Sequence, residues 1–221
     1  MGRILEFPQH AYRKVAVEQL GLIVDGDDYY REFYRAALTA RRTMVMTGWQ
    51  FDSEVPLLRG EDEAKARTPF TLLKFLNHLC EVKPELQIWI LAWDFHVVFA
   101  AEREWMQRLV FHWSTNERLK FRFDSAHVER GSHHQKFVVI DGEVSFLGGL
   151  DLAEDRWDDR RHQNENPLRV SRGKPHKPFH DIQAFLRGRA MGATLHELFA
   201  ARWEVAGGDS IAAALATPAD S

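Results

Sequence analysis

The sequence predicts an α/β fold: a mixed, mostly parallel β-sheet flanked by helices on both faces. Segments with strand character alternate along the chain with amphipathic helical segments. The segment 87–93 (QIWILAW) is apolar throughout, as expected of a strand buried on both faces of a sheet. Asp141 and Gly142 separate two apolar runs, which predicts an antiparallel hairpin near the middle or edge of the sheet.

The first half of the chain begins with a helix, expected at 28–42, where apolar residues recur at helical spacing between an acidic start and a basic end. A strand is expected at 43–50, and the charged stretch 54–68 is predicted as a loop. A second helix is expected at 70–82, because Pro84 disfavours its continuation.

The second half continues the alternation after the strand at 87–93. A helix is expected at 98–110 and the last helix at 190–206, where apolar residues lie on one face. The remaining strands are expected at 119–124, 134–140, 143–149 and 180–186.

Composition limits the class of protein. The chain has 221 residues, 45% hydrophobic and 28% charged, with a formal net charge of −3, which indicates a globular domain rather than a disordered or coiled-coil chain. This charge argues against electrostatic binding of nucleic acid over the whole protein surface. Cys80 is the single cysteine, so no intrachain disulfide forms, and no Cys/His cluster has zinc-ligand spacing. We therefore expect a reducing compartment, no metal and no cofactor.

The expected domain organisation is an N-terminal segment at 1–21, a catalytic domain at 22–208 and a linker-like tail at 209–221, rich in Ala, Gly, Pro and Ser. The sequence has neither a signal-peptide pattern nor a stretch of the ~20 apolar residues that span a membrane. The predicted location is the cytoplasm or the inner face of the membrane, with peripheral membrane contact.

The residues that predict chemistry lie around the hairpin. Side chains alternate along a strand, so His134 and Lys136 project from one face. An imidazole beside an ammonium suits a phosphate diester, because the cation binds non-bridging oxygens while the imidazole attacks phosphorus or delivers a proton. A two-residue turn would pair Lys136 with Leu147 and His134 with Gly149, leaving room for a phosphate.

The joint spacing is specific: His134-x-Lys136, four residues, Asp141, six residues, Gly148-Gly149. It resembles the HKD motif of the phospholipase D superfamily. The run 148–152 followed by 156–158 looks like the continuation after the first of two motifs in lipid-acting members. Further segments resemble the N-terminal half of bacterial phospholipase D and cardiolipin-synthase-like proteins. These segments are 22–26, 48–49, 91–94, 178–182 and 202–203, so the resemblance covers roughly 22–208.

The resemblance implies a two-step mechanism without a metal. His134 would attack phosphorus to give a phosphohistidine, and Lys136 would hold the phosphate. The histidine of a second motif would protonate the leaving alcohol, and water or another alcohol would then resolve the intermediate by hydrolysis or transphosphatidylation. Asp141 matches the acid of the motif and is interpreted as mainly structural.

Other residues have predicted supporting roles. Asp181 either orients His134 through its other ring nitrogen or is only an acid at the start of a strand. Substrate contacts are assigned to four residues near the motif: Gly148, Gly149, Asp151 and Ser132, the last of which is alternatively a local cap. The segment 156–177 contains seven Lys/Arg against three Asp/Glu. It is either solvated surface, which we favour slightly, or a rim for anionic headgroups, with Trp157 as a headgroup contact.

The chain departs from the family in one respect: it contains one HxK unit where the active site uses two. A second HKD-bearing domain or a homodimer partner is therefore expected. The Gly148-Gly149-Leu150-Asp151 run favours the N-terminal half of a two-motif enzyme acting on phospholipid. The alternatives are a homodimeric phosphodiesterase of nucleic acid, disfavoured by that run and by the net charge, and a non-catalytic lipid- or protein-binding relic.

Overall fold

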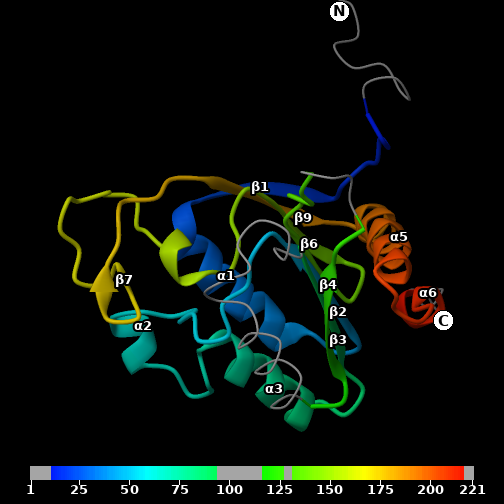
Figure 1. Cartoon of the computed structure of the whole chain (residues 1–221), viewed down its shortest axis with the longest axis horizontal. Helices are drawn as coiled ribbons and strands as arrows, with labels where there is room; N and C mark the ends of the chain where they lie inside the picture. The colour runs from blue at the N-terminus through cyan, green and yellow to red at the C-terminus, as the bar shows by residue number, and fades with distance from the viewer. Residues whose placement is uncertain (1–10, 94–115, 127–130, 217–221) are drawn as a thin grey trace, which may run out of the picture.

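A computed structural model describes residues 11–93, 116–126 and 131–216 of the chain. Its main feature is a seven-stranded sheet with the spatial order β1-β9-β6-β5-β2-β3-β4 (Figure 1). The strands of this sheet are β1 (Gln19–Val24), β2 (Thr43–Gly48), β3 (Gln87–Trp93), β4 (Leu119–Asp124), β5 (Phe137–Ile140), β6 (Val144–Gly148) and β9 (Ile182–Arg187).

The sheet is mixed, as predicted. β2, β3 and β4 pair in parallel, and the other four neighbouring pairs are antiparallel. Five of the seven strands nevertheless run in one direction, because only β5 and β9 are reversed. The expectation of a mostly parallel sheet therefore holds for strand direction and not for strand pairing. The hairpin β5–β6 lies at the centre of the sheet rather than at its edge.

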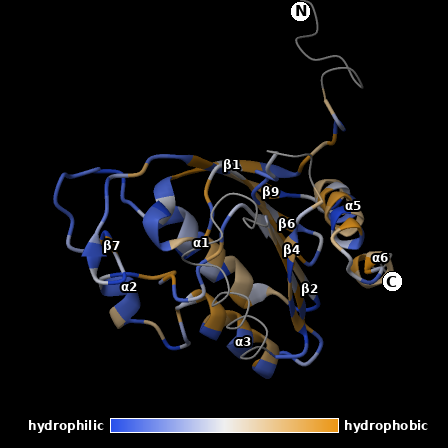
Figure 2. Cartoon of the chain, in the orientation of Figure 1, coloured by the Kyte–Doolittle hydropathy of each residue, from blue (hydrophilic) through white to orange (hydrophobic). Residues whose placement is uncertain are grey.

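Helices cover both faces of the sheet, again as predicted. α1 (Asp25–Thr39) and α3 (Leu72–Val82) lie on one side, and α5 (Arg189–Val205) lies on the other (Figure 1). Alternation along β2 divides the core between them, since Met44 and Met46 pack with the α1 and α3 side while Val45 packs with α5. The central strands are accordingly apolar on both faces (Figure 2).

The predicted elements agree with the observed ones where periodicity is strong. The strands predicted at 87–93 and 119–124 are β3 and β4. α1 begins at Asp25, earlier than expected, and the helix expected at 98–110 lies outside the described residues. Short elements occur as well. α2 (Glu61–Ala64) lies within the predicted loop 54–68, the 3-10 turn η1 (Glu154–Arg156) leads into the basic segment 156–177, and β7 (Val170–Ser171) and β8 (Lys174–Pro175) form a hairpin within that segment.

The folded domain continues beyond both predicted bounds of the catalytic domain, 22 and 208. β1 starts at Gln19, within the expected N-terminal segment, and pairs antiparallel with β9 along its whole length. After Gly208 the chain is not simply a linker, because α6 (Ala212–Leu215) places Ile211 and Leu215 in the core cluster beneath α5. Two apolar residues in an alanine-rich stretch are too sparse a pattern to predict this packing.

The predicted register of the hairpin is wrong by one residue. Glu143 N–H donates to the Ile140 carbonyl and closes the turn, but Val144, not Glu143, pairs with Ile140. The additional residue places Gly148 opposite Lys136, and Gly148 N–H donates to the Lys136 carbonyl at 3.2 Å. His134 therefore does not pair with Gly149, whose N–H instead donates to the Ile182 carbonyl at 3.2 Å.

None of the described helices is both long and apolar enough to cross a membrane.

Candidate active site

The predicted site residues other than Asp141 gather at one end of the sheet. This end is formed by the carboxyl ends of β2, β3 and β6 and by the amino ends of β5 and β9. His134 and Lys136 precede β5, Asp151 follows β6, and Asp181 precedes β9. Open α/β sheets bind ligands in the crevice at such an end, so the topology assembles one candidate site from residues distant in sequence.

A buried ion pair lies at the base of this site. Lys136 Nζ is 3.1 Å from Asp151 Oδ2, and the two side chains are 5% and 1% exposed. The other oxygen of Asp151 accepts a hydrogen bond from Trp49 N–H at 2.8 Å. Burial raises the pKa of Asp151, while the charge of Lys136 acts in the opposite direction. Lys136 Nζ is buried, and besides its ion pair with Asp151 it has no hydrogen bond of good direction to any described residue.

His134 is exposed beside a wall of indole rings. Its ring centroid lies 6.1 Å from that of Trp49, and Trp49 stacks on Trp93 with centroids 5.6 Å apart. Within the described part of the chain, the His134 ring makes no direct hydrogen bond. The imidazole is thus held against an aromatic surface with its nitrogens open to a ligand.

Asp181 and Gly149 lie against each other. A Cβ atom at Gly149 would overlap both oxygens of the Asp181 carboxylate, so glycine at this position is required for the acid to occupy its place. Asp181 Oδ1 accepts a hydrogen bond from Ile182 N–H at 2.7 Å. Gly148 is equally confined, since a Cβ there would overlap the Ile182 carbonyl and the Gln183 side chain. The predicted role of Asp181 in orienting His134 stays a prediction.

Asp141 lies at the opposite end of β5 from His134. Its carboxylate accepts hydrogen bonds from the backbone N–H groups of Arg41, Arg42 and Thr43, at 2.8, 2.8 and 2.9 Å. Its φ of +51° belongs to the left-handed region that aspartate tolerates in turns. These contacts attach the hairpin turn to the start of β2. The mainly structural role of the motif's acid stays a prediction.

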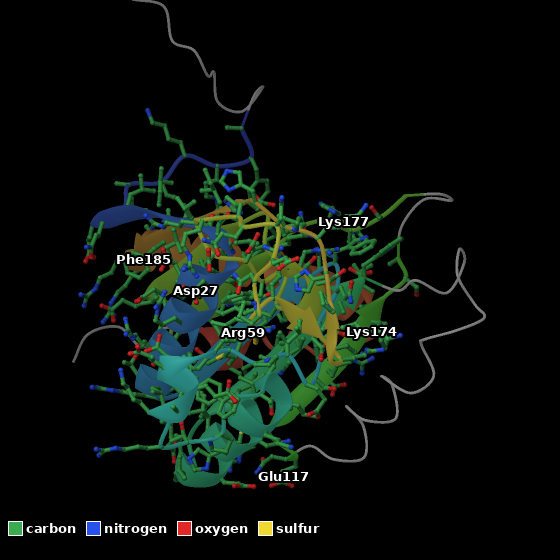
Figure 3. The ribbon with its side chains drawn as sticks, turned by 90° about the vertical axis from the view of Figure 1, so that its left-hand side faces the viewer. Asp27, Arg59, Glu117, Lys174, Lys177 and Phe185 are labelled. Atoms are coloured by element: carbon green, nitrogen blue, oxygen red, sulfur yellow. The ribbon has the colours of Figure 1, made fainter. Side chains whose placement is uncertain are left out.

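The basic segment 156–177 contains several paired cations. Arg169 is buried with its Nη1 atom 3.0 Å from Asp158 Oδ1, and Arg160 pairs with Asp28. Lys174 and Lys177 are exposed on the outer side of the fold (Figure 3). The expected headgroup contact at Trp157 is wrong, because this indole is 2% exposed beneath the guanidinium of Arg59.

Ser132, predicted as a substrate contact or a local cap, and its neighbour His133 precede β5. Ser132 is exposed ahead of β5. His133 points elsewhere: its Nε2 atom lies 3.0 Å from the Ala126 carbonyl oxygen and 3.5 Å from Asp124 Oδ2.

Sequence reasoning missed a second polar cluster, formed by Asp25, His162 and His180. These residues come from three distant segments, so no local ligand spacing indicates the cluster. The one available signal was the resemblance at 22–26 and 178–182, which marked two of the segments without relating them.

Comparisons with known proteins identify a matching family model and similar proteins. The family model described as Phospholipase D matches residues 36–219. Phospholipase D alpha 1 of Oryza sativa is 25% identical over 239 residues, covering 86% of this chain and 29% of the relative. Phospholipase D alpha 3 of Arabidopsis thaliana is 26% identical over 220 residues, covering 79% of this chain and 26% of the relative. The chain thus spans less than a third of the length of these curated relatives.

Solved structures show the same fold at low identity. NucT from Helicobacter pylori superposes with a TM-score of 0.52 at 11% identity, covering 85% of this chain and 96% of that one. Phosphatidylserine synthase of Haemophilus influenzae superposes with a TM-score of 0.53 at 12% identity, covering 83% of this chain and 36% of that one. The phospholipase D family member Nuc from Salmonella typhimurium superposes with a TM-score of 0.53 at 10% identity, covering 84% of this chain and 95% of that one. With the HKD spacing and the family match over most of its length, the chain belongs to the phospholipase D family.

Proposed function

We propose that this chain supplies one half of the active site of a phospholipid phosphodiesterase or transphosphatidylase that reacts through a phosphohistidine. The observation that carries the proposal is the buried Lys136–Asp151 pair beside the exposed ring of His134, at the ligand-binding end of the sheet. A cation held in place by a carboxylate is preorganised for a phosphate, while an exposed imidazole can reach phosphorus.

In the proposed first step, a ring nitrogen of His134 forms a bond to phosphorus as the bond from phosphorus to the leaving alkoxide oxygen breaks. Lys136 binds the non-bridging oxygens, and Asp151 fixes the position of Lys136. Asp181 would accept a hydrogen bond from the other nitrogen of His134 during this step, although the described structure does not contain that bond, and would favour the reactive tautomer. In the second step, water or an alcohol attacks phosphorus, gives its proton to the group that protonated the leaving alkoxide, and breaks the bond from phosphorus to nitrogen, which releases His134.

The leaving alkoxide needs a proton, and a histidine that has become the nucleophile cannot supply it. His134 is the only histidine in the sequence followed two positions later by lysine. We therefore infer that a second HKD histidine comes from another domain or another chain. Phospholipid is the favoured substrate because the curated relatives are named phospholipase D and the net charge is −3.

A second candidate is a homodimeric phosphodiesterase with nucleic acid as substrate. Coverage supports only its one-domain arrangement, because this chain superposes on 96% of NucT but on only 36% of the phosphatidylserine synthase. In that arrangement two copies of His134 would share one site.

The test compares hydrolysis of phosphatidylcholine vesicles and of single-stranded DNA by the wild-type chain, alone and mixed with a chain carrying a second HKD motif. We expect lipid hydrolysis in the mixture and its loss by at least about 10³-fold in His134→Asn. His133→Asn is the matched control and should keep activity within tenfold of the wild-type chain. Lipid hydrolysis that survives His134→Asn, or cleavage restricted to DNA, would overturn the proposal.

A further inference from the structure

A second cluster of ionisable side chains lies around Asp25, outside the residues assigned to phosphate chemistry. Asp25 begins α1, His162 lies in the segment 156–177, and His180 stands two residues ahead of β9. His180 Nδ1 is 2.7 Å from Asp25 Oδ1, and His162 Nε2 is 3.1 Å from Asp25 Oδ2. One nitrogen from each imidazole and one carboxylate oxygen lie within 4.8 Å of one another.

The Asp25 carboxylate is fully buried, and one of its oxygens lacks a hydrogen bond. The side chain is 0% exposed, and Oδ2 has no hydrogen bond of acceptable geometry to any described residue. The nearest nitrogen, His162 Nε2, belongs to a ring whose Nδ1 atom lies 3.0 Å from Asp158 Oδ2. When Nδ1–H donates to Asp158, Nε2 carries a lone pair that lies 3.1 Å from the carboxylate oxygen of Asp25 without pointing directly at it. Two acceptors at this distance require a cation between them, either a proton or a metal ion.

The backbone already fixes this arrangement. Asp25 N–H donates to the Asp181 carbonyl and Asp27 N–H to the Asp158 carbonyl, both at 2.9 Å. A Cβ atom at Gly26 would lie 2.7 Å from the Arg156 carbonyl oxygen, so glycine permits α1 to approach the segment 156–177 closely. The three segments that carry the cluster are therefore held together by contacts independent of its side chains.

We propose that Asp25, His162 and His180 bind one divalent transition-metal ion of the zinc class. Two imidazoles and one carboxylate form a ligand set that suits zinc and leaves a fourth position open. The His180 side chain is 64% exposed, which gives that position access to solvent or a ligand. Asp158 acts behind His162 as the carboxylate that fixes the tautomer of a metal-bound imidazole. A bound ion would join α1, the segment 156–177 and the residue before Asp181.

The experiment uses the full chain, freed of any histidine tag and of metal, and titrates it with Co²⁺ followed by visible absorption and with Zn²⁺ in competition. We expect one Co²⁺ per chain, with the absorption bands of a low-coordinate site that Zn²⁺ abolishes. Loss of an outer carboxylate partner costs about 10–100-fold in metal affinity, so loss of a direct ligand in His162→Ala or His180→Ala should weaken Zn²⁺ binding at least about tenfold.

His78→Ala, a substitution on α3, is the matched control and should bind as the wild-type chain does. Thermal melting of each variant without metal establishes that it is folded, and Zn²⁺ should raise the melting temperature of the wild-type chain and of His78→Ala only. The inference is overturned if the wild-type chain binds no Co²⁺, which would leave His162 held by a proton, or if binding survives in His162→Ala and His180→Ala alike.

Discussion

At the scale of single residues, the candidate site depends on groups that are buried beneath it. Asp151, predicted as a substrate contact, has its oxygens directed at Lys136 and at the Trp49 backbone N–H. Gly149 was predicted to leave room for a phosphate, and the structure shows that it leaves room for Asp181. The sequence identified these positions through the motif spacing, but it could not show which neighbour each one serves.

Replacing Asp151 by asparagine should destabilise the fold strongly. The substitution leaves Lys136 buried without its carboxylate, and breaking a buried ion pair in this way costs about 3–5 kcal/mol. Urea denaturation followed by circular dichroism measures the change. Asp155→Asn is the control, because Asp155 pairs with Arg156 at the surface, where such pairs contribute at most about 1 kcal/mol. Equal stability of the two variants would contradict the burial argument.

Gly149→Ala should reduce activity by displacing the Asp181 carboxylate, at a small cost in stability, because that carboxylate is the movable end of a half-buried side chain. If Asp181 orients His134, the activity losses of Gly149→Ala and Asp181→Asn should not add in the double variant. Gly21→Ala on β1 is the control, since its Cβ would meet only Phe185 at 3.9 Å. Additive losses, or full activity in Gly149→Ala, would show that the position of Asp181 is irrelevant to turnover.

At the scale of elements, strong periodicity made the central strands and the principal helices predictable. β3 and β4 are apolar or alternating over their full length, and their bounds follow from that pattern. β1 is largely exposed at the edge of the sheet and lacks a buried-face pattern, so its role depends on pairing with β9. The hairpin register was missed because one additional residue, Glu143, follows the turn, and residue types alone do not reveal this.

Asp141 belongs to this scale because it joins two elements. Asp141→Ala removes the acceptor of three backbone hydrogen bonds between the hairpin turn and the start of β2, and should lower the free energy of unfolding by on the order of 3 kcal/mol. Asp141→Asn, which keeps one acceptor oxygen and tolerates the left-handed backbone, should lose less. Both variants should keep their turnover per folded molecule. A loss of turnover without a loss of stability would assign Asp141 to the chemistry instead.

The contact between α5 and α6 should depend on pH through His196. This side chain is 4% exposed, and its Nδ1 atom lies 3.1 Å from the Leu215 carbonyl oxygen. Burial lowers the pKa of His196, while the Leu215 carbonyl and the charge of Asp141 act weakly in the opposite direction. Because the folded pKa lies below the unfolded one, the unfolded chain binds more protons as the pH falls below about 6.5, and the free energy of unfolding decreases there.

Urea denaturation above and below that pH measures the slope. His196→Gln should show a shallower slope than the wild-type chain, whereas His78→Gln should match the wild-type slope. An unchanged slope in His196→Gln would remove His196 as its source.

At the scale of the whole molecule, the chain contains one HxK unit, and its fold covers most of the solved structures of NucT and Nuc but only 36% of the phosphatidylserine synthase. The two core clusters on opposite faces of the sheet give the domain a packed interior of its own. The requirements for folding and for catalysis are therefore different. We expect the domain to fold alone, and we expect the full reaction to need a second histidine.

The most direct measurement of this claim uses a diester whose leaving group departs without a proton, such as bis(p-nitrophenyl) phosphate, beside phosphatidylcholine. Under conditions where mass measurement shows a monomer, the chain should release one equivalent of p-nitrophenolate in a burst, with the phosphoryl group mapped to His134 by mass spectrometry. It should not turn over phosphatidylcholine until a second HKD-bearing chain is added. Turnover of phosphatidylcholine by the monomer, or a labelled residue other than His134, would contradict the account.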